Sequence, residues 1–142
     1  MTNSRPPFQP VIRTQAELEE TWRTLMGPFG FGGHSVWMLV IADDDRAVPQ
    51  ITEITHAVEP PEDQMIDGLA QVLRHLDVPG QRFAFLRSRP GPGGLTANDL
   101  AWANALYDAA RRAGAACEVV HRACDADLVA VPMDALLGGD AA

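Results

Sequence analysis

The sequence predicts a single α/β domain in which helices sandwich a mixed β-sheet. Helical and strand-like segments alternate along the 142 residues, the strand-like segments are short and apolar, and 46% of the residues are hydrophobic, enough for one compact core. The expected order is helix, two strands, helix, strand, helix and two strands. We expect a flexible N-terminal arm over residues 1–13, the domain over 14–137, and a flexible tail over 138–142.

The first helix is predicted from a start signal and a stop signal. Prolines in residues 1–12 disfavour regular structure there, and Thr14 with Glu17 then forms a capping-box pattern. Apolar residues follow at helical spacing until Gly27-Pro28 ends the helix. These apolar residues are Leu18, Trp22 and Leu25. The glycine-rich segment that follows contains Phe29 and Phe31, and we expect a mobile connection able to cover a neighbouring surface.

Two strands and a helix are predicted next. Residues 36–42 are continuously apolar and precede three aspartates, which indicates a strand buried on both faces. Residues 48–58 are rich in β-branched types but contain Pro49, which is typical of a strand near a sheet edge. Pro60-Pro61-Glu62-Asp63 then opens a helix with an apolar stripe. The stripe consists of Met65, Ile66, Leu69, Val72, Leu73 and Leu76.

The C-terminal half is predicted to complete the sheet. A short buried strand at 83–86 leads into a Gly/Pro loop at 90–95. Thr96 and Asp99 form a second capping-box pattern, and the helix that they open ends at Gly114. Residues 117–122 and 127–131 are expected to be strands, followed by a helical turn at 133–137.

Composition excludes several classes of function. Eleven arginines, no lysine and 19 acidic residues give a formal charge of -8, so a nucleic-acid partner is not expected. No apolar run reaches the length of a membrane span or of a signal peptide core. The two cysteines, Cys117 and Cys124, are too few for a disulfide framework. We therefore expect a cytoplasmic protein without a membrane partner.

The sequence around the Gly/Pro loop resembles a known family. It reads Arg87-Ser88-Arg89-Pro90, then GPGGL, then Thr96-Ala97-Asn98-Asp99. The order of elements over residues 33–137 and this motif are similar to the JAB/MPN (JAMM) domain superfamily, most closely to its RadC-like branch. The resemblance implies a three-layer fold of the cytidine-deaminase-like kind.

The same resemblance implies that the metal site of the family is degenerate here. Arg87 and Arg89 stand where active members have two zinc-binding histidines, and Ser35 stands where they have a catalytic glutamate. Only Asp99 is kept. A guanidinium is always protonated and has no lone pair to give to a metal, so we expect neither a metal nor another cofactor.

The first interpretation is therefore a catalytically inactive JAB/MPN-like domain that acts as a binding or scaffolding module, with a protein partner or a second copy of itself. One alternative is a metal-free enzyme or a sensor of small anions, in which Arg87, Arg89 and Thr96 hold an anion. His34 and His121 would then be cleft residues, and one or the other would supply acid/base chemistry. A second alternative is a zinc-dependent hydrolase whose ligands have not been aligned.

Simpler interpretations of the same residues stay open at this stage. Thr96 and Asp99 are explained by the capping box alone. Arg87 and Arg89 could be a solvated pair at a strand end, or could converge on one anion because residues two apart on a strand share a face.

Overall fold

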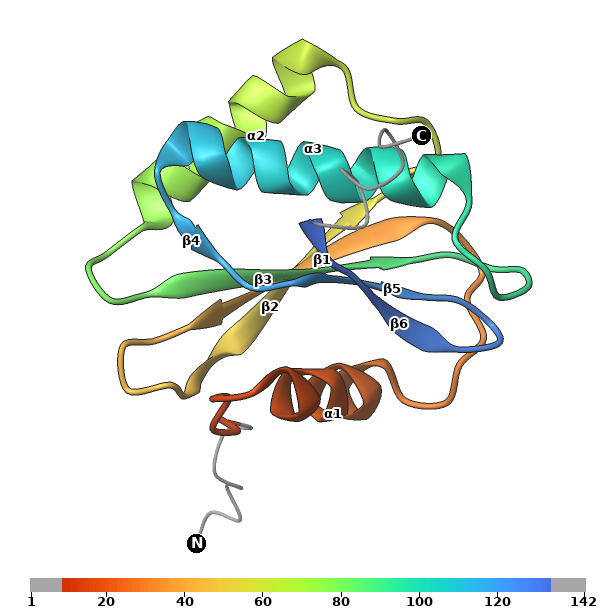
Figure 1. Ribbon diagram of the computed structural model, residues 1–142, viewed down its shortest axis with the longest axis horizontal. Helices are drawn as coiled ribbons and strands as arrows, with labels where there is room; N and C mark the ends of the chain where they lie inside the picture. The colour runs from red at the N-terminus through yellow and green to blue at the C-terminus, as the bar shows by residue number, and fades with distance from the viewer. Residues whose placement is uncertain (1–8, 134–142) are drawn as a thin grey trace, which may run out of the picture.

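A computed structural model describes residues 9–133 of the chain. Within them lie three helices and six strands (Figure 1). The helices are α1 (Gln15–Met26), α2 (Asp63–Leu76) and α3 (Ala97–Ala113). The strands are β1 (Ser35–Ile41), β2 (Ala47–Thr55), β3 (Arg82–Ser88), β4 (Ala116–Cys117), β5 (Val120–Ala123) and β6 (Leu128–Val131).

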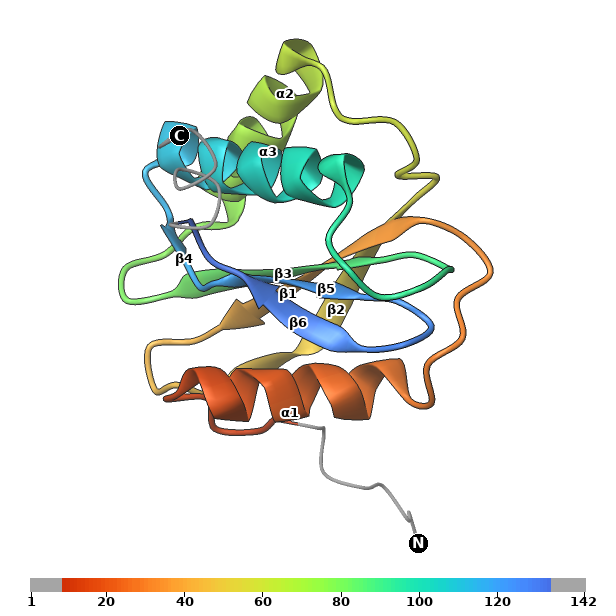
Figure 2. The ribbon, with the colours of Figure 1, turned by 45° about the vertical axis from the view of Figure 1, so that its right-hand side comes forward.

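The strands form one mixed sheet in the order β2-β1-β3-β5-β6, and β4 pairs with β3 beside β5. β1 is antiparallel to β2 and β3, whereas β5 runs parallel to β3 and antiparallel to β6. Helix α1 covers one face of the sheet, and α2 and α3 lie on the other (Figures 1 and 2). The predicted mixed α/β class, with a sheet between helices, is confirmed.

Each face of the sheet has its own core. On the α1 side, Leu18 and Trp22 of α1 are fully buried against Leu39, Ile41 and other strand residues. On the opposite side, the α3 face packs on Phe83 and Phe85 of β3, and α2 packs mainly against α3. The two capping boxes predicted from sequence are both formed, and Gly114 ends α3 in the left-handed conformation with φ 68°.

Several boundaries differ from the sequence prediction, and β2 ends at Thr55 and not at residue 58. Residues 9–13 do not behave as an arm, because Ile12 is buried in the α1-side core and its N–H donates to the Asp45 carbonyl at 2.7 Å. β3 extends to Ser88, so Arg87 lies inside the strand and not after it. The strand predicted at 117–122 is split into β4 and β5, and between them the Glu118 N–H still donates to the Phe83 carbonyl of β3. Of the helical turn predicted at 133–137, residues 134–137 lie outside the described residues.

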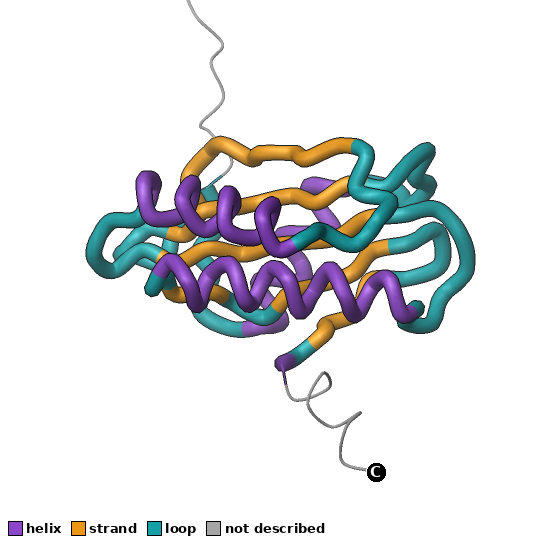
Figure 3. The backbone as a smooth tube through the Cα atoms, turned by 90° about the horizontal axis from the view of Figure 1, so that it is seen from above, coloured by secondary structure: helices purple, strands orange, loops and turns teal. Residues whose placement is uncertain are grey.

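The stripe predicted on the second helix is only partly buried. Ala70 and Leu73 are inaccessible, whereas Met65, Val72 and Leu76 are exposed. Seen from above, α2 and α3 lie side by side over the sheet (Figure 3).

Among the helices of residues 9–133, none has both the length and the apolar character that crossing a membrane requires.

Candidate functional site

The residues of the predicted site meet where β3 ends and α3 begins. Arg87 lies opposite Val36 of β1, and both side chains are on the sheet face that carries α2 and α3. Arg89 follows two residues later and reaches the same place. Asp99 occupies the third position of α3 and closes the capping box. The structure therefore brings Arg87, Arg89, Thr96 and Asp99 together.

The carboxylate of Asp99 is at the centre of this cluster, and its side chain has no exposed surface. It accepts hydrogen bonds from Arg87 Nε at 3.2 Å, from Arg89 Nε at 2.8 Å and from the Thr96 N–H at 3.0 Å. Burial alone would raise the pKa of Asp99, but the hydrogen bonds from Arg89 and Thr96, followed by Arg87, hold it below the ordinary value. The negative charge of Asp99 is therefore already balanced by arginines of the same chain.

Arg89 is saturated by protein acceptors. Its Nε and one Nη bind both oxygens of Asp99. Its remaining N–H groups donate to the carbonyls of Pro90 and Pro92 at 3.1 Å and of Gly94 at 2.9 Å. These contacts use all five N–H groups of a guanidinium. Arg89 thus organises the Gly/Pro loop and has no donor left for a ligand.

Arg87 is held in a similar way and is 1% exposed, so the two arginines are not a solvated pair. Its Nη atoms donate to the Ala57 carbonyl at 2.6 Å and contact His34 Nδ1 at 3.1 Å. Its guanidinium carbon lies 5.7 Å from the centre of the Trp102 ring, within the range of a cation–π contact.

A third arginine was not predicted from sequence. Arg122 of β5 pairs with Arg87 in the parallel register, so both side chains are on the same face. Arg122 Nε lies 3.8 Å from Asp99 Oδ2 and has no hydrogen-bond partner, while one Nη donates to Asp127 at 2.8 Å. Only a general signal was present in the sequence, because a buried arginine must find a carboxylate but its position in the chain does not say which one.

Asp125, also missed, ties two loops to the site. One carboxylate oxygen accepts from the Phe31 N–H at 2.9 Å and the other from the Gly91 N–H at 2.9 Å. The pKa of Asp125 is lowered by these two backbone hydrogen bonds. The glycine-rich segment expected to be a mobile connection is therefore fastened to the Gly/Pro loop.

His34 lies beside the cluster, but its geometry limits its chemistry. Because Arg87 is always a donor, Nδ1 of His34 must offer its lone pair, which leaves the imidazole neutral with its proton on Nε2. Burial, then the charges of Arg87 and Arg89, lowers the pKa of His34. The only lone pair of the ring is thus already used, and His34 is a donor and not a base in this state.

Ser35 and His121 face the other side of the sheet. Side chains alternate along a strand, and Ser35 is next to Val36, which faces α3. The Ser35 hydroxyl donates to Glu53 at 2.7 Å. His121 Nε2 lies 3.1 Å from Glu19 of α1, and burial lowers the pKa of His121 although Glu19 acts in the opposite direction. The structure does not bring Ser35 or His121 to the arginine cluster.

The chemistry of the cluster is that of a closed ionic network. Three guanidinium groups contact two carboxylates, those of Asp99 and Asp127, which leaves one excess positive charge in a strongly acidic chain. Within residues 9–133, no group of three or more histidine, cysteine or acidic side chains is placed to hold a metal ion. The cysteines, Cys117 and Cys124, are both free thiols.

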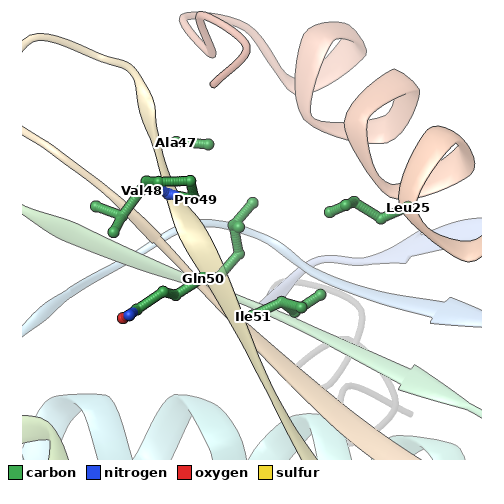
Figure 4. Close-up of a pocket in the computed structure, with 7 residues that line it drawn as sticks. Leu25, Ala47, Val48, Pro49, Gln50 and Ile51 are labelled. Atoms are coloured by element: carbon green, nitrogen blue, oxygen red, sulfur yellow. The ribbon is translucent and has the colours of Figure 1, made fainter. Parts of the chain in front are cut away.

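Three hollows of the surface are lined by residues other than the three arginines and Asp99. One lies between α1 and the first half of β2, where Leu25 points across toward residues 47–51 (Figure 4). Its walls are mainly aliphatic and hold no titratable side chain. Two others lie over the end of β2 and the adjoining flank of α2, with Trp102 in their lining.

His34, which is half-buried, and His121, which is buried, give a testable pH dependence. Folding lowers the pKa values of both histidines, so the unfolded chain binds more protons than the folded chain at mildly acidic pH. The free energy of unfolding is therefore highest above the ordinary histidine pKa of about 6.5, and it decreases as the pH falls below that value. We expect the free energy of unfolding to fall by about 1 kcal/mol between pH 7.5 and pH 5.5. Urea unfolding across this range measures it, and the slope should be smaller in His34→Asn. A slope that is flat in the wild type would contradict the assignment.

Comparison with known proteins gives no match to a family model, to a curated protein sequence or to a solved structure. The molecule is a mixed α/β domain with a buried arginine–aspartate network.

Proposed function

We propose that the chain is a catalytically inactive JAB/MPN-like domain of the RadC type that acts as a binding module. The main support for this proposal is that the Asp99 carboxylate is already fully engaged by other side chains. Asp99 is the one metal-ligand position that the motif keeps. Its carboxylate is buried and engaged by Arg87 and Arg89, with Arg122 behind it. A carboxylate so engaged has no free lone pair directed at an ion, and the guanidinium groups around it would repel one.

The same contacts argue against the two alternatives. An anion sensor needs free donors that a ligand can reach; Arg89 has none, and Arg87 and Arg122 are each only 1% exposed. A metal-free enzyme needs a proton acceptor, and the lone pair of His34 is taken by Arg87. A zinc hydrolase needs three or four converging ligands, which residues 9–133 do not bring together.

The surface supports binding in place of catalysis. Five apolar side chains with 37% to 57% exposure lie near the end of β2 and along α2. They are Ile54, Val58, Met65, Val72 and Leu76. β2 is also an edge strand, since its only neighbour in the described sheet is β1. Exposed apolar side chains gathered in one region are typical of protein interaction sites.

Metal binding tests this proposal directly. We expect protein dialysed against zinc chloride and then against buffer to retain far less than one equivalent of zinc by elemental analysis, and its melting temperature not to rise with added zinc. The matched control is Asp99→Asn, which should give the same low zinc content. One equivalent of zinc in the wild type, lost in Asp99→Asn, would overturn the proposal.

A further inference from the structure

The chain that leads into α1 already pairs with the start of β2. The Ala47 N–H donates to the Pro10 carbonyl at 2.9 Å, and the Ile12 N–H donates to the Asp45 carbonyl at 2.7 Å. These two bonds flank an antiparallel bridge. The chain before Pro10 is therefore directed along the free edge of β2, whose only neighbour in the described sheet is β1.

The first half of this free edge borders an open hollow on the α1 side of the sheet. The hollow has a volume of about 200 Å³, and Leu25 of α1 points across it toward residues 47–51 (Figure 4). Sites for small-molecule ligands are larger, about 300–1,000 Å³. The mainly aliphatic walls and the small size of the hollow suit a single apolar side chain.

We infer that residues 6–9 continue along the edge of β2 as an added antiparallel strand and that the side chain of Phe8 fills this hollow. The register comes from the bridge between Val11 and Arg46. Each step back along the chain is one step forward along β2, so Phe8 falls opposite Pro49. Pro49 is the middle one of the five β2 residues that line the hollow.

The alternation of side chains along a strand gives the face. Phe8 is four residues from Ile12, so both side chains are on the same side of the sheet. Ile12 is buried in the core on the α1 side, and Leu25 packs against that core. The side chain of Phe8 is therefore directed to the side on which the hollow lies.

The prolines of this segment are compatible with an edge strand. Proline is tolerated there because one side of an edge strand needs no donors. Pro10 and Ile12 turn their polar backbone groups toward β2, so Phe8 is the next residue to do so. The missing N–H of Pro7 then falls on the solvent side. Pro6 offers β2 only its carbonyl, so the pairing ends there.

The chain's own segment is a better occupant than a partner because it is tethered beside the hollow. Phe8 is two residues from Pro10, about 7 Å in an extended chain. A short tether gives an effective concentration in the millimolar range, which a free partner rarely reaches. Charge agrees, since residues 1–8 contain one charged side chain, that of Arg5, and the whole chain carries a formal charge of -8.

This contact goes beyond the proposed binding function, because it makes one part of the β2 edge an internal site. An extended segment of a partner can pair with residues 48–51 only after residues 6–9 have left. The apolar side chains at the end of β2 and along α2 are not part of this contact.

Nuclear Overhauser effects in the full-length protein test the contact directly. We expect cross-peaks between the ring protons of Phe8 and the methyl groups of Leu25 and Ile51. A mixed sample of labelled and unlabelled copies separates contacts within one chain from contacts between two chains. Cross-peaks only between chains would assign the hollow to a second copy, and no cross-peak would leave it without Phe8. Either result overturns the inference.

Phe8→Ala measures what the contact contributes to stability. We expect the melting temperature to fall by about 5 °C, because an aromatic side chain loses its buried surface. The matched control is Gln9→Ala, at the neighbouring side chain, which is exposed. It should melt within about 2 °C of the wild type. A Phe8→Ala variant that melts like Gln9→Ala overturns the inference.

A double variant separates this hollow from any other place that Phe8 could occupy. Leu25→Ala removes the wall that faces β2, so its loss of stability and that of Phe8→Ala should not add in the double variant. Fully additive losses would mean that Phe8 packs elsewhere and would overturn the inference. None of these variants changes Arg87, Arg89 or Asp99, so the outcome is independent of the zinc measurement that tests the proposed function.

Discussion

Asp99→Ala is expected to lower the free energy of unfolding by about 3–5 kcal/mol, enough to unfold much of a marginally stable domain. The substitution removes the one carboxylate that Arg87 and Arg89 share, and the nearest anion to Arg122 Nε. Guanidinium groups cannot release their protons to escape this loss. Two side chains that are at most 6% exposed would therefore carry charge without a partner.

The experiment needs a control for the helix cap that Asp99 also forms. Glu17 occupies the same third position in the capping box of α1, but it is exposed and contacts no buried cation. Glu17→Ala should therefore cost much less than Asp99→Ala. Urea unfolding followed by tryptophan fluorescence compares the two variants. If Asp99→Ala costs no more than Glu17→Ala, the capping box alone explains Asp99 and the ionic network contributes nothing.

Local signals in the sequence were sufficient to predict most of the helices and strands. Thr14, Glu17, Thr96 and Asp99 predicted both capping boxes, because this pattern acts within one turn of the chain and does not depend on tertiary contacts. The apolar run at 36–42 predicted β1 within one residue. Boundaries that depend on distant partners were missed, such as the end of the predicted arm, where Ile12 packs in the α1-side core and its N–H donates to the Asp45 carbonyl.

The sequence predicted only some members of the site, and it did not predict how their side chains are engaged. The motif indicated that Arg87, Arg89 and Asp99 converge, and they do. Which faces Ser35 and His121 occupy depends on sheet register, and a shift of one residue reverses the face. Arg122 could not be assigned without knowing that β5 lies beside β3. The saturation of Arg89 by loop carbonyls is a matter of backbone geometry in a Gly/Pro segment, which side-chain patterns do not describe.

Arg89→Ala is expected to cost about 2–4 kcal/mol, since it removes one partner of Asp99 and every side-chain donor to three loop carbonyls. Arg89→Lys keeps the positive charge but offers three donors from a single point in place of a planar fork. It cannot reach Asp99 and the carbonyls of Pro90, Pro92 and Gly94 together. We therefore expect it to recover less than half of the loss.

The same pair of variants decides between a structural and a ligand-binding role for Arg89. A structural role predicts that both variants unfold at lower urea and that limited proteolysis cuts residues 90–95 faster than in the wild type. The matched control is Arg46→Lys, at a side chain that is 56% exposed, and it should stay within about 0.5 kcal/mol of the wild type. If Arg89→Ala leaves stability unchanged but abolishes a thermal shift produced by phosphate or sulfate, Arg89 is a free donor after all. The contacts of Arg89 with Asp99 and with three carbonyls would then not stabilise the fold. The anion-sensing alternative would replace the proposed function of an inactive binding module.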